Sequence, residues 1–267
     1  MFTSYRGGQG KGLMRNVGDL AAARNSWLLQ ENKNLDYLLH LRYSWMNDFI
    51  PSSAKGLEIG SGIGASKQYL KSDLTILISD NNENGWLDIR NLDARKIKNC
   101  DQLGLDFVIA NNVIHHLAFP AEFIIKAFEV LPKDGKIIIQ EIHTSLFCRI
   151  VLKLLRHEPF NEKANPFDIS KPMSNQNDNW DANCSIPKLL FSDPIKFEQN
   201  FPGLKVSYFK YSETFLLLLS GGVTAKTWYP KLPRFLLEAI KRVDDLLCAL
   251  APDWFAFQMQ LVIERTD

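Results

Sequence analysis

The stretch that decides the fold is Gly56-Leu57-Glu58-Ile59-Gly60-Ser61-Gly62-Ile63-Gly64. It begins as a short apolar strand with one acidic residue and then breaks into three glycines at alternate positions. Glycine lets the backbone turn with positive φ and leaves no side chain between the chain and a ligand. A helix that begins near Ala65 would point its free N–H groups and the positive end of its dipole into the same space. The stretch therefore predicts a loop that binds a nucleoside-bearing cofactor.

The spacing of the glycines separates two classes of cofactor. In the dinucleotide fingerprint G-x-G-x-x-G the third glycine comes five positions after the first, whereas Gly64 comes one position earlier than that after Gly60. Glu58 precedes the first glycine, and a carboxylate there would repel a pyrophosphate but suits a cofactor that carries an ammonium group. An NAD site is therefore the disfavoured alternative.

The segments after the glycine loop continue an alternating α/β pattern. Residues 74–80 are a nearly continuous apolar run that ends in Asp80, which is typical of a strand buried in a parallel sheet. At the carboxyl edge of such a sheet, that carboxylate can accept hydrogen bonds from a ribose diol. The same position would serve NAD, so Asp80 alone does not separate the two cofactors. Residues 86–89 are a third strand candidate, and Asp93-Ala94 follow it. By itself, Asp93 is explained more simply as a turn or helix cap.

Two later strands keep the same order. Residues 105–110 form an Asp-Phe-aliphatic strand, and residues 111–117 (Asn-Asn-Val-Ile-His-His-Leu) form a turn at its tip. A helix from about 120 to 130 leads to the turn Leu-Pro-Lys-Asp-Gly at 131–135. An apolar fifth strand follows over residues 136–141.

The five elements between residues 55 and 141, in this order and spacing, resemble the core of the class I S-adenosylmethionine (SAM) dependent methyltransferases, with a core like that of methyltransferase type 11. The resemblance implies a doubly wound α/β fold with a seven-stranded, mostly parallel sheet of the Rossmann-like methyltransferase kind, in which helical insertions form a cap. It implies SAM as the cofactor, with Asp93 and the backbone of Ala94 at the adenine and His116 packed near the cofactor. The cofactor-binding residues that it implies are Glu58, Gly60, Ser61, Gly62, Gly64, Asp80, Asp93, Ala94, Asn111 and His116.

Composition and charge narrow the class of protein. Of 267 residues, 46% are hydrophobic and 17 are phenylalanines, which suffices for the core of one large domain with insertions. The formal net charge of +1 argues against a broad nucleic-acid groove, so we expect no nucleic-acid partner. The four cysteines form neither Cys-x-x-Cys pairs nor a zinc spacing, so we expect reduced thiols, a cytoplasmic protein and no metal site. The N-terminus lacks the apolar run of a signal peptide, and no segment approaches the roughly 18 apolar residues of a spanning helix.

We expect residues 1–54 to form a helical lead or cap, and residues 55–267 to form the SAM-binding domain. Residues 34–46 are typical of an amphipathic helix. In the methyltransferases that the chain resembles, a helix in this place often closes over the cofactor, which makes Tyr43, and also Arg42, candidates for ligand contact. The favoured alternative is that the aromatic stripe of this helix belongs to the core.

Insertions at about residues 144–200 and 213–255 depart from a minimal methyltransferase. The first opens with a predicted helix whose cations share one face: Arg149, Lys153 and Arg156. The second holds a Leu-rich loop and a helix over about 233–250 with a wide apolar stripe. Such faces suit peripheral contact with a membrane or with a lipid tail. The favoured alternative is that they pack on the sheet and cap the substrate.

An oxygen nucleophile benefits from a general base, and a histidine suits this role. His143 is the first choice because its position after the fifth strand faces the substrate side in this fold, and His115 is the second. Asp178 and Trp180 of the first insertion are candidates to line the acceptor pocket. For each of these residues, a structural or solvent-exposed role is the plainer alternative.

The sequence thus predicts a SAM-dependent methyltransferase that acts on a small-molecule, glycan or lipid-linked acceptor, at oxygen. The alternative is a catalytically silent SAM-binding partner or regulatory protein. The first 54 residues and both insertions carry no specific motif, and these parts would select the acceptor.

Overall fold

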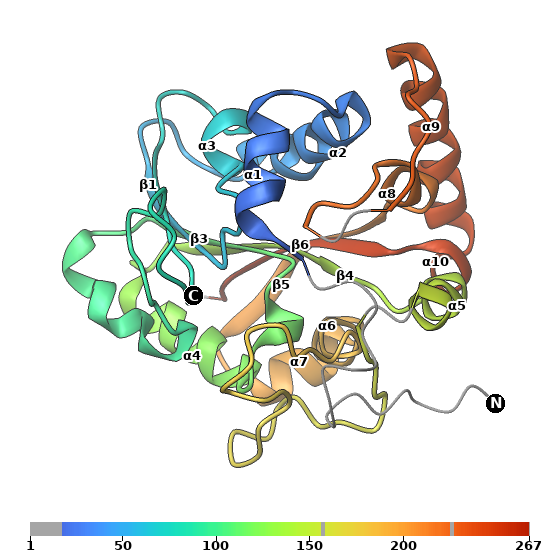
Figure 1. The fold of residues 1–267 in the computed structure, drawn as a ribbon. Coiled ribbons are helices and arrows are strands. Elements are labelled where there is room, and N and C mark those ends of the chain that lie inside the picture. Colours follow the sequence, from blue (N-terminus) through green and yellow to red (C-terminus); the bar gives the residue numbers. More distant parts are fainter. Residues whose placement is uncertain (1–17, 156–157, 225–226, 267) are drawn as a thin grey trace.

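The computed structural model describes residues 18–155, 158–224 and 227–266. Its strands are β1 (Lys55–Ile59), β2 (Thr75–Ile78), β3 (Phe107–Asn111), β4 (Lys136–Ile142), β5 (Leu204–Ser212) and β6 (Gln258–Arg265). They form one sheet in the order β2-β1-β3-β4-β6-β5 (Figure 1). β1 to β4 are parallel, whereas β6 runs antiparallel to both of its neighbours. The strand order reverses between β1 and β3, and ligands of such sheets bind outside the carboxyl ends of the strands at that point.

The mostly parallel α/β sheet agrees with the sequence prediction, but in the described residues it has six strands instead of seven, because the third predicted strand, over residues 86–89, does not form. That segment contributes an isolated bridge between Ser79 and Ile89. The carboxylate of Asp88 accepts the backbone N–H of Ile78 at 2.8 Å. The Asp88 side chain thus occupies a backbone N–H of β2 that a further strand would bind, and residues 86–89 remain a loop.

Helices cover both faces of the sheet (Figure 1). They are α1 (Leu20–Leu28), α2 (Lys33–Ser44), α3 (Ser66–Tyr69), α4 (Pro120–Val130), α5 (Leu146–Leu155), α6 (Ile186–Phe191), α7 (Pro194–Asn200), α8 (Phe215–Leu219), α9 (Arg234–Leu250) and α10 (Pro252–Phe255). Three 3-10 segments complete the described elements: η1 (Trp45–Asp48), η2 (Ala94–Leu103) and η3 (Ile114–His116).

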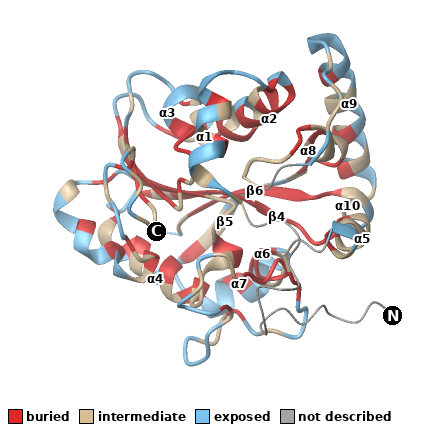
Figure 2. Ribbon diagram, viewed as in Figure 1, coloured by how far each residue is buried: buried red, intermediate tan, exposed pale blue. Residues whose placement is uncertain are grey.

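The sheet separates two apolar clusters because successive side chains of a strand point to opposite faces. On β4, Ile137 and Ile139 join the cluster that contains α4, α6 and α7, whereas Ile138 joins the cluster that contains α1 and α2. The central strands are buried on both faces (Figure 2), which explains why their sequences are nearly continuous apolar runs.

The helix predicted over residues 34–46 is α2, with its last turn continued as η1. The side chain of Asn32 caps it by accepting the backbone N–H of Leu35 at 3.1 Å. α1 precedes it and has no counterpart among the predicted elements. Both helices share an apolar cluster with the sheet. The first 17 residues of the predicted lead lie outside the described part of the chain.

The two insertions supply α5 to α7 and α8 to α10. α5 is the predicted cationic helix, although Arg156 lies outside the described residues. The Leu-rich segment predicted as a loop is helix α8, because the buried carboxylate of Asp244 accepts the N–H groups of residues 214–216 at its start. Among the described residues, no helix has both the length and the apolar character needed to cross a membrane.

Candidate functional site

The glycine loop after β1 forms one wall of a cavity of about 860 Å³. Gly60 and Gly62 line it and have φ angles of +65° and +53°. A Cβ on Gly60 would lie 2.3 Å from Cγ2 of Val113, so a larger residue does not fit there without a shift. A Cβ on Gly62 would have Cδ2 of Leu20 at 3.7 Å as its nearest neighbour, so the backbone at Gly62 is open to a ligand.

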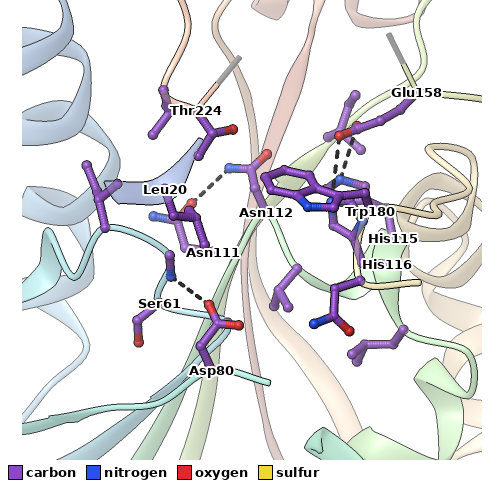
Figure 3. A pocket seen from close by; sticks show the side chains of 18 of the residues that line it. Leu20, Ser61, Asp80, Asn111, Asn112, His115, His116, Glu158, Trp180 and Thr224 are labelled. Carbon is purple, nitrogen blue, oxygen red and sulfur yellow. Dashed lines mark hydrogen bonds and ion pairs between the residues drawn. The ribbon is translucent and has the colours of Figure 1, made fainter. Parts of the chain in front are cut away.

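Asp80 and Ser61 hold the glycine loop in place. Oδ2 of Asp80, just after β2, accepts the N–H of Gly62 at 2.9 Å, and burial raises the pKa of this carboxyl group. The hydroxyl of Ser61 donates to the carbonyl of Glu58 and accepts the N–H of Ser79. Both Asp80 and Ser61 line the cavity and lie on the same side of it (Figure 3).

Two of the predicted cofactor residues lie behind the cavity wall instead of in it. Glu58 is fully buried, and its carboxylate accepts the hydroxyls of Tyr43 at 2.8 Å and Ser66 at 2.6 Å. Burial raises the pKa of Glu58 to about 7. Gly64 has a φ of +73°, and a Cβ there would lie 2.9 Å from Cδ1 of Ile78. Glu58 therefore ties α2 and α3 to the loop, and Gly64 allows the loop to pack on β2.

Tyr43 and Arg42 line the cavity from α2, and their polar groups have protein partners. The Tyr43 hydroxyl binds Glu58, as described above. The guanidinium of Arg42 forms a buried pair with both carboxylate oxygens of Glu213, at 2.8 and 2.7 Å. Both side chains therefore connect α2 to the sheet, in line with the core alternative.

Asp93 and Ala94 line the cavity at the start of η2. The Asp93 carboxylate accepts the backbone N–H of Arg95 at 2.9 Å and the Arg95 guanidinium at 2.6 Å. Burial alone would raise the pKa of Asp93, but these bonds to Arg95 lower it. Asp93 thus acts as the helix cap of the plainer alternative and also forms part of the cavity wall.

Asn111 and Asn112, at the tip of β3, line the middle of the cavity (Figure 3). Nδ2 of Asn112 donates to Oδ1 of Asn111 at 2.8 Å, and Oδ1 of Asn112 accepts from Nε2 of Gln258 at 2.9 Å. Asn112 has a φ of +53°, a conformation that asparagine tolerates better than most residues. Asn112 was not among the predicted site residues. The signal that could have revealed it is a polar side chain directly after a buried strand.

At the other end of the cavity, two histidines face one carboxylate (Figure 3). His115 lies with Nδ1 2.7 Å from Oε2 of Glu141 and with Nε2 3.4 Å from Oε2 of Glu158. His116 lies with Nε2 3.7 Å from Oε1 of Glu158 and with Nδ1 3.1 Å from the backbone oxygen of Asp181. We call His115, His116 and Glu158 the His–Glu cluster.

Glu141 supports this cluster from β4, where it is fully buried. Its carboxylate accepts the backbone N–H groups of Val113 and Ile114, which begin the turn that carries both histidines. Burial disfavours a charged imidazole, but the carboxylates of Glu141 and Glu158 raise the pKa of His115 to about 10. Burial and the neighbouring His115 lower the pKa of His116.

His143, the first choice as general base, does not line the cavity. Ile142 at the end of β4 does, and because successive side chains alternate, His143 points to the other side. Its ring is buried 4.7 Å from the ring of Tyr211, and Nε2 lies 3.6 Å from Oδ1 of Asp253. Burial lowers the pKa of His143 to about 4. His143 therefore lies outside the wall of this cavity, whereas the prediction placed it on the substrate side.

Asp178 and Trp180 line the cavity from the loop of the first insertion. Asn179 between them donates to the backbone oxygen of Asn81 at 2.7 Å and accepts from the Asn81 side chain at 3.1 Å. These bonds fix the loop of the insertion to the segment after β2.

Glu158 was missed by sequence reasoning, because nothing in its spacing joins it to His115. The cavity wall also includes an apolar part, formed by α5 and α8, that was not assigned to the site. Its residues are Val151, Leu152, Leu155, Leu217 and Leu218.

No family model and no curated protein matches the sequence. Solved structures do resemble the fold. The plantazolicin methyltransferase BamL, in complex with a triazolic desmethylPZN analog and SAH, is 12% identical with a TM-score of 0.45, and the match covers 93% of this chain and 90% of that one. A putative S-adenosylmethionine dependent methyltransferase from Listeria monocytogenes is 10% identical with a TM-score of 0.45, with 85% and 98% covered. A cyclopropane-fatty-acyl-phospholipid synthase-like protein from Lactobacillus casei ATCC 334 is 13% identical with a TM-score of 0.44, with 94% and 96% covered.

At such identities and TM-scores, the function has to be inferred from the geometry of the chain itself.

Proposed function

We propose that the protein is a SAM-dependent methyltransferase that methylates an oxygen of an acceptor with an apolar part. The observation that carries this proposal is a single cavity of about 860 Å³ that joins the glycine loop to the His–Glu cluster. Ligand sites of proteins typically measure about 300–1,000 Å³. The cavity is therefore large enough for a nucleoside cofactor at one end and part of an acceptor at the other.

The cofactor end suits SAM better than a dinucleotide. Gly62 leaves its backbone open to the cavity, and Asp80 places a carboxylate, rather than a cation, beside it. A carboxylate in this place can bind a ribose diol, which SAM and NAD both carry, so the preference for SAM rests on the spacing of the glycines. When bound, SAM supplies an electrophilic methyl group on sulfur.

The acceptor end offers groups that can take a proton. A hydroxyl oxygen that receives a methyl group must lose its proton, and a positioned side chain typically accelerates such a transfer by about 10²–10⁴-fold. The carboxylate of Glu158 and Nε2 of His116 both line this end of the cavity. Glu141 orients His115 beside them from a fully buried position.

The apolar wall formed by α5 and α8 favours an acceptor that carries a hydrocarbon segment. Of the three acceptor classes that the sequence allows, a lipid-linked one fits this wall best, because burial of apolar surface contributes about 25 cal/mol per Å². Exposed apolar residues continue from this wall: Leu154 on α5, which also lines the cavity, then Phe235, Leu246 and Leu250 on α9, and Trp254 on α10. We call this exposed set the outer apolar face. We propose that it contacts the surface of a membrane, as in peripheral membrane proteins.

The cofactor is tested by calorimetry with S-adenosylhomocysteine (SAH) and, in parallel, with NADH. We expect SAH to bind and NADH to give no signal. The reaction is tested by incubating the protein with a cell lysate and SAM labelled in its methyl group. We expect label to pass into the organic phase on extraction, and Glu158→Gln to reduce this by about 100-fold.

Three outcomes separate the alternatives. No binding of SAH would refute the proposal in all its forms. Binding of SAH without label in any product would support a silent SAM-binding partner. Label confined to the aqueous phase would keep the methyltransferase but exclude the lipid-linked acceptor.

A further inference from the structure

We propose that His115, His116 and Glu158 bind a divalent transition-metal ion of the zinc class at the acceptor end of the cavity. Each residue offers one ligand atom, and these atoms lie within 4.8 Å of one another. The carboxylate oxygens of Glu158 are 3.4 and 3.7 Å from the two imidazole Nε2 atoms. Metal–ligand bonds of about 2.1 Å in a tetrahedral site place neighbouring ligand atoms about 3.4 Å apart. The two separations from Glu158 are close to this value, and all three ligand atoms lie within 4.8 Å of one another.

The second observation concerns the opposite side of each imidazole ring. Nδ1 of His115 lies 2.7 Å from the Glu141 carboxylate, and Nδ1 of His116 lies 3.1 Å from the backbone oxygen of Asp181. Both of these oxygens can accept a hydrogen bond but cannot donate one. In the neutral rings that a metal would need, the proton would therefore sit on Nδ1, and the Nε2 lone pairs would be directed toward Glu158. Histidines that bind metals almost always show this arrangement, with a carboxylate or carbonyl behind the ring.

Glu158 is oriented in the same manner. The thiol of Cys184, which is fully buried, donates to Oε2 of Glu158 at 3.3 Å. Each of the three ligands thus has a fixing partner outside the set: Glu141, Asp181 and Cys184. Spacing in the sequence could not reveal the site, because Glu158 follows the two histidines by more than forty positions.

The donor set selects among metals. Two imidazoles and one carboxylate suit Zn²⁺, Mn²⁺, Fe²⁺ or Co²⁺, whereas Mg²⁺ and Ca²⁺ prefer sites made of oxygen ligands alone. Three protein ligands would leave at least one coordination position open, and all three ligand residues line the cavity. We infer that it would take an oxygen of the acceptor; with the ion bound, Glu158 and His116 would act as its ligands instead of taking the proton themselves. This part rests on the proposed function, whereas metal binding itself does not.

The experiment measures Zn²⁺ affinity of the chelator-treated full-length protein by competition with a chromophoric chelator, with Mg²⁺ as a comparison. We expect one equivalent of Zn²⁺ to bind. Glu158→Gln and His116→Gln should each weaken binding by more than about 100-fold, because removing an orienting group already costs about 10–100-fold. Cys184→Ala, which removes an orienting group, should cost about 10-fold. Co²⁺ should give the visible spectrum of a site with nitrogen and oxygen ligands and no thiolate band.

His40→Gln serves as the matched control, because His40 is an exposed histidine of α2 outside the cavity wall. It should leave Zn²⁺ affinity unchanged. SAH binding by each variant shows that the fold and the cofactor end are intact. Failure to bind Zn²⁺, or binding that Glu158→Gln and His116→Gln leave unchanged, would overturn the inference and leave a protonated His115 held between two carboxylates. Failure to bind SAH would instead refute the proposed function.

Discussion

The two ends of the cavity are built in different ways. The cofactor end consists of the glycine loop, Asp80 and the Asp93-Ala94 pair, which follow one another within about forty residues. Backbone conformation determines much of it, as the positive φ angles of Gly60 and Gly62 show. The acceptor end joins the turn after β3, Glu158 beyond the end of α5, and a loop of the first insertion. The backbone conformation of adjacent residues can be predicted from the sequence, whereas contacts between distant segments cannot.

Gly60→Ala should have the largest effect on the cofactor end. A left-handed conformation costs a non-glycine residue about 1–2 kcal/mol, and crowding in a packed region costs about 1–3 kcal/mol more. The added methyl would lie 2.3 Å from Val113, at the tip of β3. We expect the free energy of unfolding to fall by about 2–5 kcal/mol, measured by urea denaturation, and SAH binding to be lost.

Gly104→Ala is the matched control for this substitution. Gly104 has nearly the same φ of +62°, but a Cβ there would meet nothing within 4 Å. It should cost about 1–2 kcal/mol and leave SAH affinity unchanged. Equal effects of the two substitutions would show that the backbone, and not the fit of the loop against Val113, determines the cofactor end.

The buried carboxyl of Glu58 should make stability depend on pH. Because burial raises its pKa to about 7 in the folded state, the folded protein keeps the Glu58 proton at pH values where the unfolded chain has released it. The stabilisation is complete below the unfolded pKa of about 4.3 and is lost as the pH rises to about 7. We expect a loss of about 3 kcal/mol over this range.

Glu58→Gln stays neutral at every pH and should remove this component. The measurement is the difference in unfolding free energy between wild type and variant, at intervals from pH 4.5 to 8. A difference that does not change with pH would mean that Glu58 is charged in the folded protein. Glu58 would then be able to attract a positively charged cofactor.

Asp80→Asn separates the charge of Asp80 from its support of the loop. Asparagine can still accept the N–H of Gly62, but it lacks the carboxylate that we assign to the ribose diol. We expect SAH to bind about 10-fold more weakly in calorimetry, since hydrogen bonds to charged groups contribute about 1.5–3 kcal/mol. Asp88→Asn is the control, because Asp88 also accepts a backbone N–H at β2 but lies outside the cavity wall. A similar loss in both variants would contradict a direct role of Asp80.

The comparison also explains which parts of the molecule the sequence could predict. The parallel strands and the glycine turn were predicted because burial on both faces and positive φ restrict the residue types. The third predicted strand failed because one side chain, Asp88, occupies the edge of β2. Glu158 could not be predicted, since the contact that gives it a role depends on how α5 ends relative to η3. His143 was predicted on the substrate side, but the alternation of side chains along the chain after β4 places its neighbour Ile142 at the cavity instead.

His143→Gln should have the smallest effect and tests whether the acceptor end is the His–Glu cluster. His143 lies on the side of β4 away from the cavity, so removal of its imidazole takes away a contact with Tyr211 and no group that meets a ligand. We expect turnover to change by less than about 3-fold, whereas loss of a true general base typically costs about 10²–10⁴-fold. The measurement is the rate of methyl transfer from labelled SAM, with SAH affinity as a check on folding. A loss of 100-fold or more with intact SAH binding would place the reacting oxygen near β5 and contradict the assignment of the acceptor end.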